Sequence, residues 1–300
     1  MVGVIVHLPF LRRAVCLPVL ARLWLPGDPD HTPLQLAREL LDLVIAHLGD
    51  QPMHLVGDAA YIGKPLRGLP TQVTVTARLR ADAALYTPAP PRTGRAGRPR
   101  VKGDRLPELV VIAAMTRYQW IPVQVRCYGK TLDREVLALG CLWYGALGRQ
   151  PVQVILSRPV GAPDGYELAL VTTDLAATPA QVIERYADRW SAEQAFLDAR
   201  HLAGVGQART RTRRSVERLV PFGLVCLSLA ICWYAHPAQD LAAHRALAPW
   251  YRTKQTVSVA DMLAALRRAL LAAQYRDGHP DQHILDLFPD ALLTQLDPAA

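Results

Sequence analysis

The sequence predicts a mixed α/β fold with a large buried core. Hydrophobic residues make up 51% of the 300 positions, which excludes a wholly disordered chain or a collagen-like repeat. An amphipathic helix over residues 33–48 is followed by β-prone runs at 54–56 and 73–79, the alternation expected of an α/β sheet. A later series of short strands leads to a second helix, whose N-cap is Thr178. The length predicts one large domain or two ordinary ones.

The N-terminal elements begin with a β-branched run. Residues 2–8 predict a short buried strand, and the prolines that punctuate residues 9–33 predict a loop-rich stretch. The helix at 33–48 carries one apolar stripe, with Pro33 suited to its first turn and Gly49 to its end. The order of helix, strand, connection and strand over residues 33–79 is the one expected of an α/β sheet.

The composition changes after the run at 73–79. Residues 88–107 combine prolines with a cluster of basic side chains and predict a flexible, positively charged segment. Strands are then expected at four places: 121–127, 135–144, 152–158 and 166–172. We therefore expect residues 81–165 to be an insertion that consists of a basic loop and a small antiparallel sheet.

The remaining chain is predicted to be helical. A long helix should run from Thr178 to about His201, a buried helix from 216 to 234, and a last helix over 259–273. The expected organisation has four parts: 1–80 as the first part of the core, 81–165 as the insertion, 166–236 as the second part of the core, and 237–300 as a helical tail.

The charge balance favours a nucleic-acid partner. The formal net charge is +8, and among 34 basic residues only four are lysines. Arginine's planar guanidinium suits bidentate contacts with phosphate. The alternative is that a chain rich in Ala, Leu, Arg and Pro only reflects GC-rich coding.

Cysteines and apolar runs indicate the compartment. The five cysteines are scattered and form no Cys-x-x-Cys pair, which suits a reducing cytosol. The apolar run 219–235 is short for a membrane span and contains Pro221 and Gly223, so a buried core helix is the better interpretation. No export signal is recognisable at the start. We expect a cytoplasmic protein with no membrane partner.

Four residues of the helix after Thr178 form a charged stripe. Tyr186, Arg189, Glu193 and Arg200 would fall within an arc of roughly 60° on one continuous helix. One carboxylate flanked by two guanidiniums and a phenol is a candidate metal or phosphate site. The alternative is a solvated row of salt bridges.

Asp58 is the second candidate, because it directly follows the strand at 54–56. Ligands of open α/β sheets bind beyond the carboxyl ends of strands, although an aspartate after glycine is also a common turn former. Together, Asp58 and Glu193 could hold Mg²⁺ for in-line attack on a phosphodiester.

The spacing Tyr186-x2-Arg189-x3-Glu193-x6-Arg200 resembles the Tyr-x2-Arg-x3-Glu-x6-Lys signature of bacterial insertion-sequence DDE transposases. The string from Glu184 to Glu193 and the string Val56-Gly-Asp-Ala-Ala-Tyr61 also look like this family, in particular the 701-like branch of the insertion-sequence group-four superfamily. The resemblance implies an RNase H-like core interrupted by a β-rich insertion, followed by a helical C-terminal part.

The resemblance also implies roles. Asp58 would be the second catalytic acid and Glu193 the third, both as ligands of a two-ion Mg²⁺ site, and Arg200 stands where the family has lysine. Double-stranded DNA at transposon ends and target would be the partner, with a homo-oligomer in a synaptic complex. The expected DNA-binding residues are Tyr186, Arg189, Arg200, Arg92, Arg95, Arg98, Arg100, Arg209, Arg211 and Arg213.

The chain departs from the family at its start. The family's first aspartate lies on an earlier core strand that has no counterpart here, so the chain resembles an N-terminally truncated transposase. We expect either a sheet with an open edge at the strand 54–56 or a rearrangement that lays residues 2–8 beside it. Catalysis by this chain would then be impaired. The alternatives are a non-enzymatic DNA-binding remnant and another RNase H-like nuclease.

Overall fold

The computed structural model describes residues 1–28, 31–91, 99–207, 209, 212–236 and 256–276. The chain divides into two compact units. Unit 1 comprises Met1–Ile5 and Leu20–Glu193, and unit 2 comprises Val6–Val19 and Gln194–Ala300.

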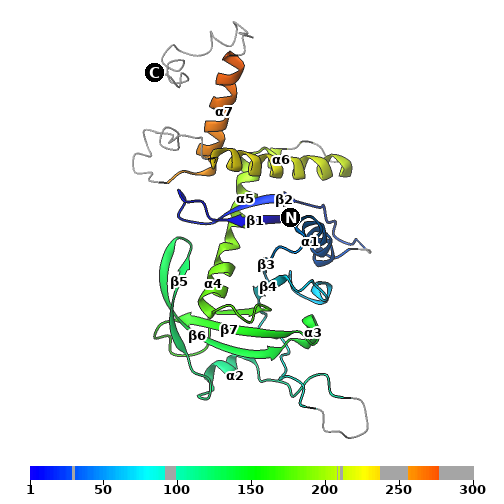
Figure 1. The fold of residues 1–300 in the computed structure, drawn as a ribbon, viewed down its shortest axis with the longest axis vertical. Helices are drawn as coiled ribbons and strands as arrows, with labels where there is room; N and C mark the ends of the chain where they lie inside the picture. The colour runs from blue at the N-terminus through cyan, green and yellow to red at the C-terminus, as the bar shows by residue number, and fades with distance from the viewer. Residues whose placement is uncertain (29–30, 92–98, 208, 210–211, 237–255, 277–300) are drawn as a thin grey trace. The chain divides into compact units, whose positions relative to one another are not determined.

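A six-stranded sheet forms the centre of unit 1 (Figure 1). Its strands, in spatial order, are β3 (Met53–Gly57), β4 (Val73–Arg78), β8 (Leu168–Thr172), β7 (Pro151–Pro159), β6 (Lys130–Leu142) and β5 (Ile121–Cys127). β3 and β4 are parallel, and every other neighbouring pair is antiparallel. The mixed α/β class is confirmed. The strands expected in the insertion are hydrogen-bonded into the same sheet as β4.

One face of the sheet packs against α4 (Pro179–Asp188). Thr178 and Gln181 form a reciprocal capping box, and Pro179 occupies the first turn, so the sequence specifies where this helix begins. Its apolar side bears Val182 and Ile183, which are buried against side chains of β5 to β8. This packing sets the position of the C-terminal end of α4.

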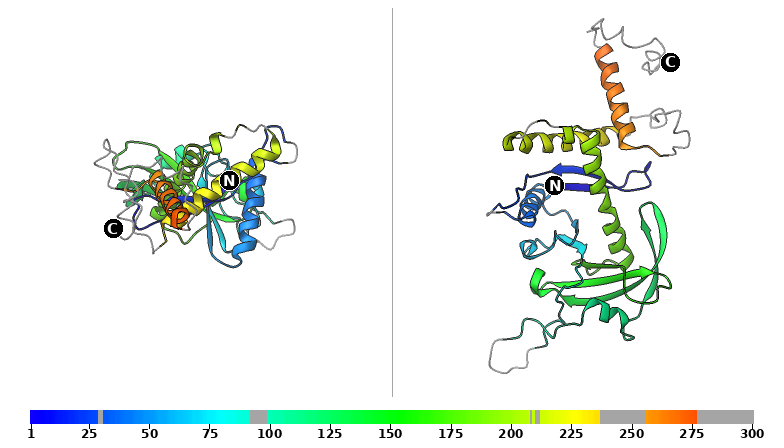
Figure 2. Two further views of the ribbon diagram at one scale, coloured as in Figure 1. Left: turned by 90° about the horizontal axis from the view of Figure 1, so that it is seen from above. Right: turned by 180° about the vertical axis from the view of Figure 1, so that it is seen from behind.

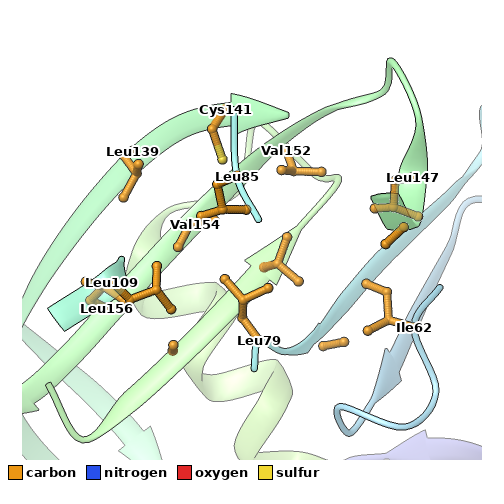
Figure 3. Close-up of a cluster of buried hydrophobic side chains, with 14 of the residues drawn as sticks. Ile62, Leu79, Leu85, Leu109, Leu139, Cys141, Leu147, Val152, Val154 and Leu156 are labelled. Atoms are coloured by element: carbon orange, nitrogen blue, oxygen red, sulfur yellow. The ribbon is translucent and has the colours of Figure 1, made fainter. Parts of the chain in front are cut away.

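The opposite face carries the larger core of buried hydrophobic side chains (Figure 3). Four short or medium helices contribute residues to it. These are α1 (Pro33–Leu48), η1 (Lys64–Leu66), α2 (Leu109–Ala114) and α3 (Tyr144–Leu147). Leu109 of α2, Leu147 of α3 and Val154 of β7 are all buried in this cluster. The sheet is therefore covered on both faces, as α/β architecture requires.

β3 is an edge strand, because its only strand partner in the described residues is β4. β1 (Val2–Val6) pairs with β2 (Val15–Leu20) in a separate two-stranded sheet. The alternative that lays residues 2–8 beside β3 is therefore wrong, and the open edge is observed. The loop expected over 9–33 is also wrong in part, because β2 lies within it. Pro18 is tolerated in β2 because a two-stranded sheet leaves one edge of each strand free of ladder hydrogen bonds.

The helix predicted from Thr178 to His201 is interrupted at one residue. α4 ends at Asp188, and α5 spans Trp190–His201. At the junction, the Arg189 N–H donates to the carbonyl oxygen of Tyr186 at 3.2 Å. This bond spans three residues, as in a 3₁₀ turn, instead of the four of an α-helix. The four residues of the charged stripe are therefore divided between two helices.

Unit 2 contains the long helices α6 (Arg213–Tyr234) and α7 (Val259–Arg276), which pack against each other (Figure 2). The prediction that the apolar helix is buried holds for one face only. Leu227 and Ile231 are buried, whereas Phe222 and Leu229 are exposed. By length and composition, α6 is the one helix of the described chain that could span a membrane, which by itself is weak evidence for a span.

Candidate functional site

A cavity of about 770 Å³ lies where the carboxyl ends of β3 and β4 meet the end of α4. Its lining comes from four segments: the turn after β3, the end of β4 with the residues that follow it, the start of β8, and the end of α4 with its C-cap residue Arg189. The lining residues are Asp58, Ala59, Ala60, Arg78, Leu79, Arg80, Ala81, Asp82, Tyr166, Glu167, Ala169, Tyr186 and Arg189. The cavity therefore brings Asp58 together with the first two residues of the charged stripe.

Asp58 occupies a tight turn that closes β3. Its Oδ1 accepts a hydrogen bond from the Ala60 N–H at 2.8 Å, and its carbonyl oxygen accepts one from the Tyr61 N–H at 3.1 Å. Gly57 allows this turn, because a Cβ there would lie 3.1 Å from Tyr61 Cβ. The turn-forming interpretation of Asp58 and its placement in the cavity are thus both observed.

Arg189 links the cavity to Glu193. Arg189 Nη2 donates to Glu193 Oε1 at 2.8 Å, and the guanidinium carbon lies 5.4 Å from the centre of the Tyr186 ring. Burial disfavours the charged guanidinium, but the hydrogen bond to Glu193 and the nearby Tyr186 outweigh it and raise the pKa of Arg189. Glu193 does not line the cavity itself, but it forms an ion pair with Arg189, which does.

One donor of Arg189 is left without a partner. Its Nε is buried and makes no hydrogen bond to any residue that the structure describes. An unsatisfied buried donor costs roughly 1–3 kcal/mol, and more for a charged group. An anionic oxygen entering the cavity could remove this penalty, since Arg189 also lines the cavity.

Asp58 and Glu193 are the type of ligand that a divalent cation prefers, but two carboxylates are fewer than the roughly three ligands of a typical protein metal site. Mg²⁺ prefers oxygen ligands such as Asp58 and Glu193. Within the described ranges, no group of three His, Cys, Asp or Glu side chains is close enough to hold a metal ion. Glu193 would have to exchange its bond to Arg189 for a bond to the ion.

A polar cluster fixes α4 to the edge of the sheet, one residue before Tyr186. Arg185 Nη1 donates to Asp174 Oδ2 at 2.7 Å and lies 3.5 Å from His54 Nδ1. The His54 ring nitrogens lie 2.7 Å and 2.9 Å from the hydroxyls of Thr74 and Thr76. Burial, and then the charge of Arg185, lower the pKa of His54 to about 4, while Asp174 opposes this shift. His54 is therefore neutral near pH 7 and serves to position α4.

The other predicted DNA-binding residues lie outside the cavity. Arg100 pairs with Asp104 at 3.0 Å and is exposed. Arg200, Arg209 and Arg213 are exposed residues of unit 2, and Arg213 pairs with Glu217. Arg92, Arg95, Arg98 and Arg211 lie outside the described residues.

The sequence-based search missed several lining residues. Arg78, Asp82, Tyr166 and Glu167 were not among the predicted site residues, although all line the cavity. Arg78 carried a usable signal: like Asp58, it stands at the carboxyl end of a predicted strand. Asp82 also follows β4, four residues after its end. Tyr166 and Glu167 were not recognisable, because β8 runs antiparallel to β4 and only this pairing brings the start of β8 to the same end of the sheet.

Residues 1–131 match the family model described as DDE superfamily endonuclease. No curated protein matches the chain. The matched range contains Asp58 and Arg78 but ends before Tyr186, Arg189 and Glu193. The matched range is less than half of the chain and shows a similarity to DDE superfamily endonucleases, a class of proteins for which DNA is the implied substrate and divalent metals are in general use. The six-stranded sheet with its helices is consistent with the RNase H-like fold of such proteins.

Proposed function

We propose that this chain is the catalytic region of a DDE transposase of bacterial insertion sequences, in the group-four superfamily and its 701-like branch. It would hydrolyse and transfer phosphodiesters at transposon ends. The observation that carries the proposal is the shared cavity of Asp58, Tyr186 and Arg189, two parts of one signature that are distant in the sequence.

The residues have distinct proposed roles. Asp58 and Glu193 would hold Mg²⁺, which when bound stabilises charge on the oxygens of a phosphodiester. Arg189 would bind a phosphate oxygen through its unpartnered Nε, and Tyr186 would lie beside the sugar-phosphate backbone of the DNA. Arg200 and the arginine clusters would bind DNA away from the cavity.

The wider organisation is part of the proposal. The core would comprise residues 1–80 and 166–236, separated by an insertion over 81–165 and followed by a tail over 237–300. The protein would act in the cytoplasm as a homo-oligomer in a synaptic complex with double-stranded DNA.

A strand-nicking assay with Mg²⁺ tests the catalytic role. The chain and a version extended upstream in the same reading frame are compared on DNA that carries the transposon ends. Nicking should depend on Mg²⁺ and fall by at least ~100-fold in Asp58→Asn, because a ligand of the reacting centre is lost. Asp50→Asn is the matched control, since Asp50 is an exposed aspartate just before β3.

The alternative function is DNA binding without catalysis. It is favoured by the absence of a three-ligand group from the described residues and by the bond that holds Glu193 to Arg189. Salt-dependent DNA binding without Mg²⁺-dependent nicking by either version would establish this alternative and refute the catalytic role.

A further inference from the structure

Among the residues that the structure describes, the charges that line the cavity are paired except for Arg78 and Asp58. Arg80 makes two hydrogen bonds to Asp82, both at 3.1 Å, and Arg189 pairs with Glu193. Glu167 pairs with Arg134 at 2.6 Å.

Arg78 has neither an ion pair nor a hydrogen bond from its side chain to any residue of the described ranges. Its guanidinium is therefore the lining cation that no carboxylate neutralises.

The strand register places this arginine beside Asp58. β3 and β4 are parallel, and Gly57 pairs with Ala77, so Asp58 and Arg78 follow at the same end of adjacent strands. No ion pair joins them within the described chain, although their charges are opposite. The two groups thus flank a common space rather than neutralising each other.

Alternation along β4 determines the face on which Arg78 lies. Val75, Ala77 and Leu79 belong to the core beneath α1 and α2, so the intervening positions face the other side. On that side Thr76 contacts His54, which lies beside Arg185 of α4. Arg78 therefore shares its face with the end of α4, where Tyr186 and Arg189 line the same cavity.

We infer that Arg78 binds a non-bridging oxygen of the DNA phosphate that enters next to Asp58, and so positions the phosphodiester for reaction. A guanidinium matches two phosphate oxygens with two parallel N–H bonds, which fixes orientation as well as charge. The inference rests on the proposed function, since it assigns a phosphate-binding residue to that same site.

The test measures the affinity for a fluorescein-labelled DNA duplex by fluorescence anisotropy between 50 and 200 mM salt, without Mg²⁺. Arg78→Gln should weaken binding about tenfold at low salt and reduce the slope of log affinity against log salt by about 1. Arg78→Lys should keep the slope, because it keeps the charge. Arg149→Gln is the matched control and should stay within about twofold, because Arg149 is exposed and does not line the cavity.

Three outcomes separate the possibilities. Equal effects of Arg78→Gln and Arg149→Gln, or no effect of either, overturn the role of Arg78 while leaving the proposed function intact. A wild-type chain that does not bind the duplex overturns both. Thermal melting of each variant shows whether it is folded, and Arg78→Lys preserves the test if Arg78→Gln is not.

Discussion

His54 shows how one residue joins the sheet to the helix that carries the signature. It stands on the edge strand β3, contacts two threonines of β4, and lies next to Arg185 of α4. Such a histidine must remain neutral, because a proton would add a positive charge beside that guanidinium. The stability of the site end of α4 is therefore tied to pH.

We expect the free energy of unfolding to fall as pH is lowered from about 6.5 to about 4. The folded pKa of His54 is lowered to about 4, so in this window the unfolded chain takes up a proton that the folded chain does not. The loss should be on the order of 2 kcal/mol. The lowered pKa of Asp174 acts at more acidic pH, since its contribution is lost only below the usual range of a carboxyl group.

Urea unfolding at pH 7 and pH 4.5 measures this effect. His54→Gln should flatten the pH dependence, whereas His47→Gln, at an exposed position of α1, should leave it as in the wild type. An unchanged slope in His54→Gln would show that another group is responsible.

At the scale of elements, the two ends of the basic segment, residues 86–87 and 102–104, contact each other and form what we call its neck. The Thr87 N–H donates to the Asp104 carbonyl oxygen at 2.9 Å, and the Gly103 N–H donates to the Thr87 carbonyl oxygen at 2.9 Å. Lys102 Nζ lies 3.4 Å from the centre of the Tyr86 ring and closes the same neck. The two ends of the segment between them are thereby held together.

Gly103→Ala should destabilise this neck by about 2 kcal/mol or more, because overpacking there meets backbone as well as side chain. A Cβ at position 103 would lie 2.1 Å from Thr87 Oγ1 and 2.6 Å from the Pro88 carbonyl oxygen. Gly140→Ala on β6 is the control, since nothing lies within 4 Å of its added Cβ. Equal unfolding free energies for the two variants, measured in urea, would contradict this account of the neck.

At the scale of the whole molecule, the net charge of +8 and the arginine-rich composition indicate an electrostatic contribution to DNA binding. The cavity accounts for only a small part of this charge. The rest would act over a wider surface and make affinity strongly dependent on salt.

Changing Arg92, Arg95, Arg98 and Arg100 together to Gln should lower the slope of log affinity against log salt by about 3 to 4, if each contacts one phosphate. The same change at four arginines elsewhere in the chain, Arg22, Arg117, Arg126 and Arg149, serves as a control of equal charge. Equal slopes for the two variants, measured by fluorescence anisotropy, would assign the binding to net charge rather than to the basic segment.

The sequence alone determined the local elements and the chemistry of single residues. The helix over residues 33–48 and the strand over 121–127 have the predicted bounds, because hydrophobic period and capping residues act over a few positions. The sequence also identifies Asp58, Tyr186 and Arg189 as candidate site residues. Local patterns gave the wrong prediction at two places. The prolines of residues 9–33 predicted a loop where β2 forms, and the helical pattern after Thr178 predicted one continuous helix where the structure has an interruption at Arg189.

Only the tertiary structure decided which of these residues meet. The pairing of β4 with the antiparallel strand β8, together with the packing of α4 on that sheet, brings Asp58, Arg78, Tyr186 and Arg189 around one cavity. It also decided that Arg78 is left unneutralised in the described structure while Arg80 and Arg189 are paired. Such outcomes depend on distances across strands and helices, which a one-dimensional pattern of side chains does not contain.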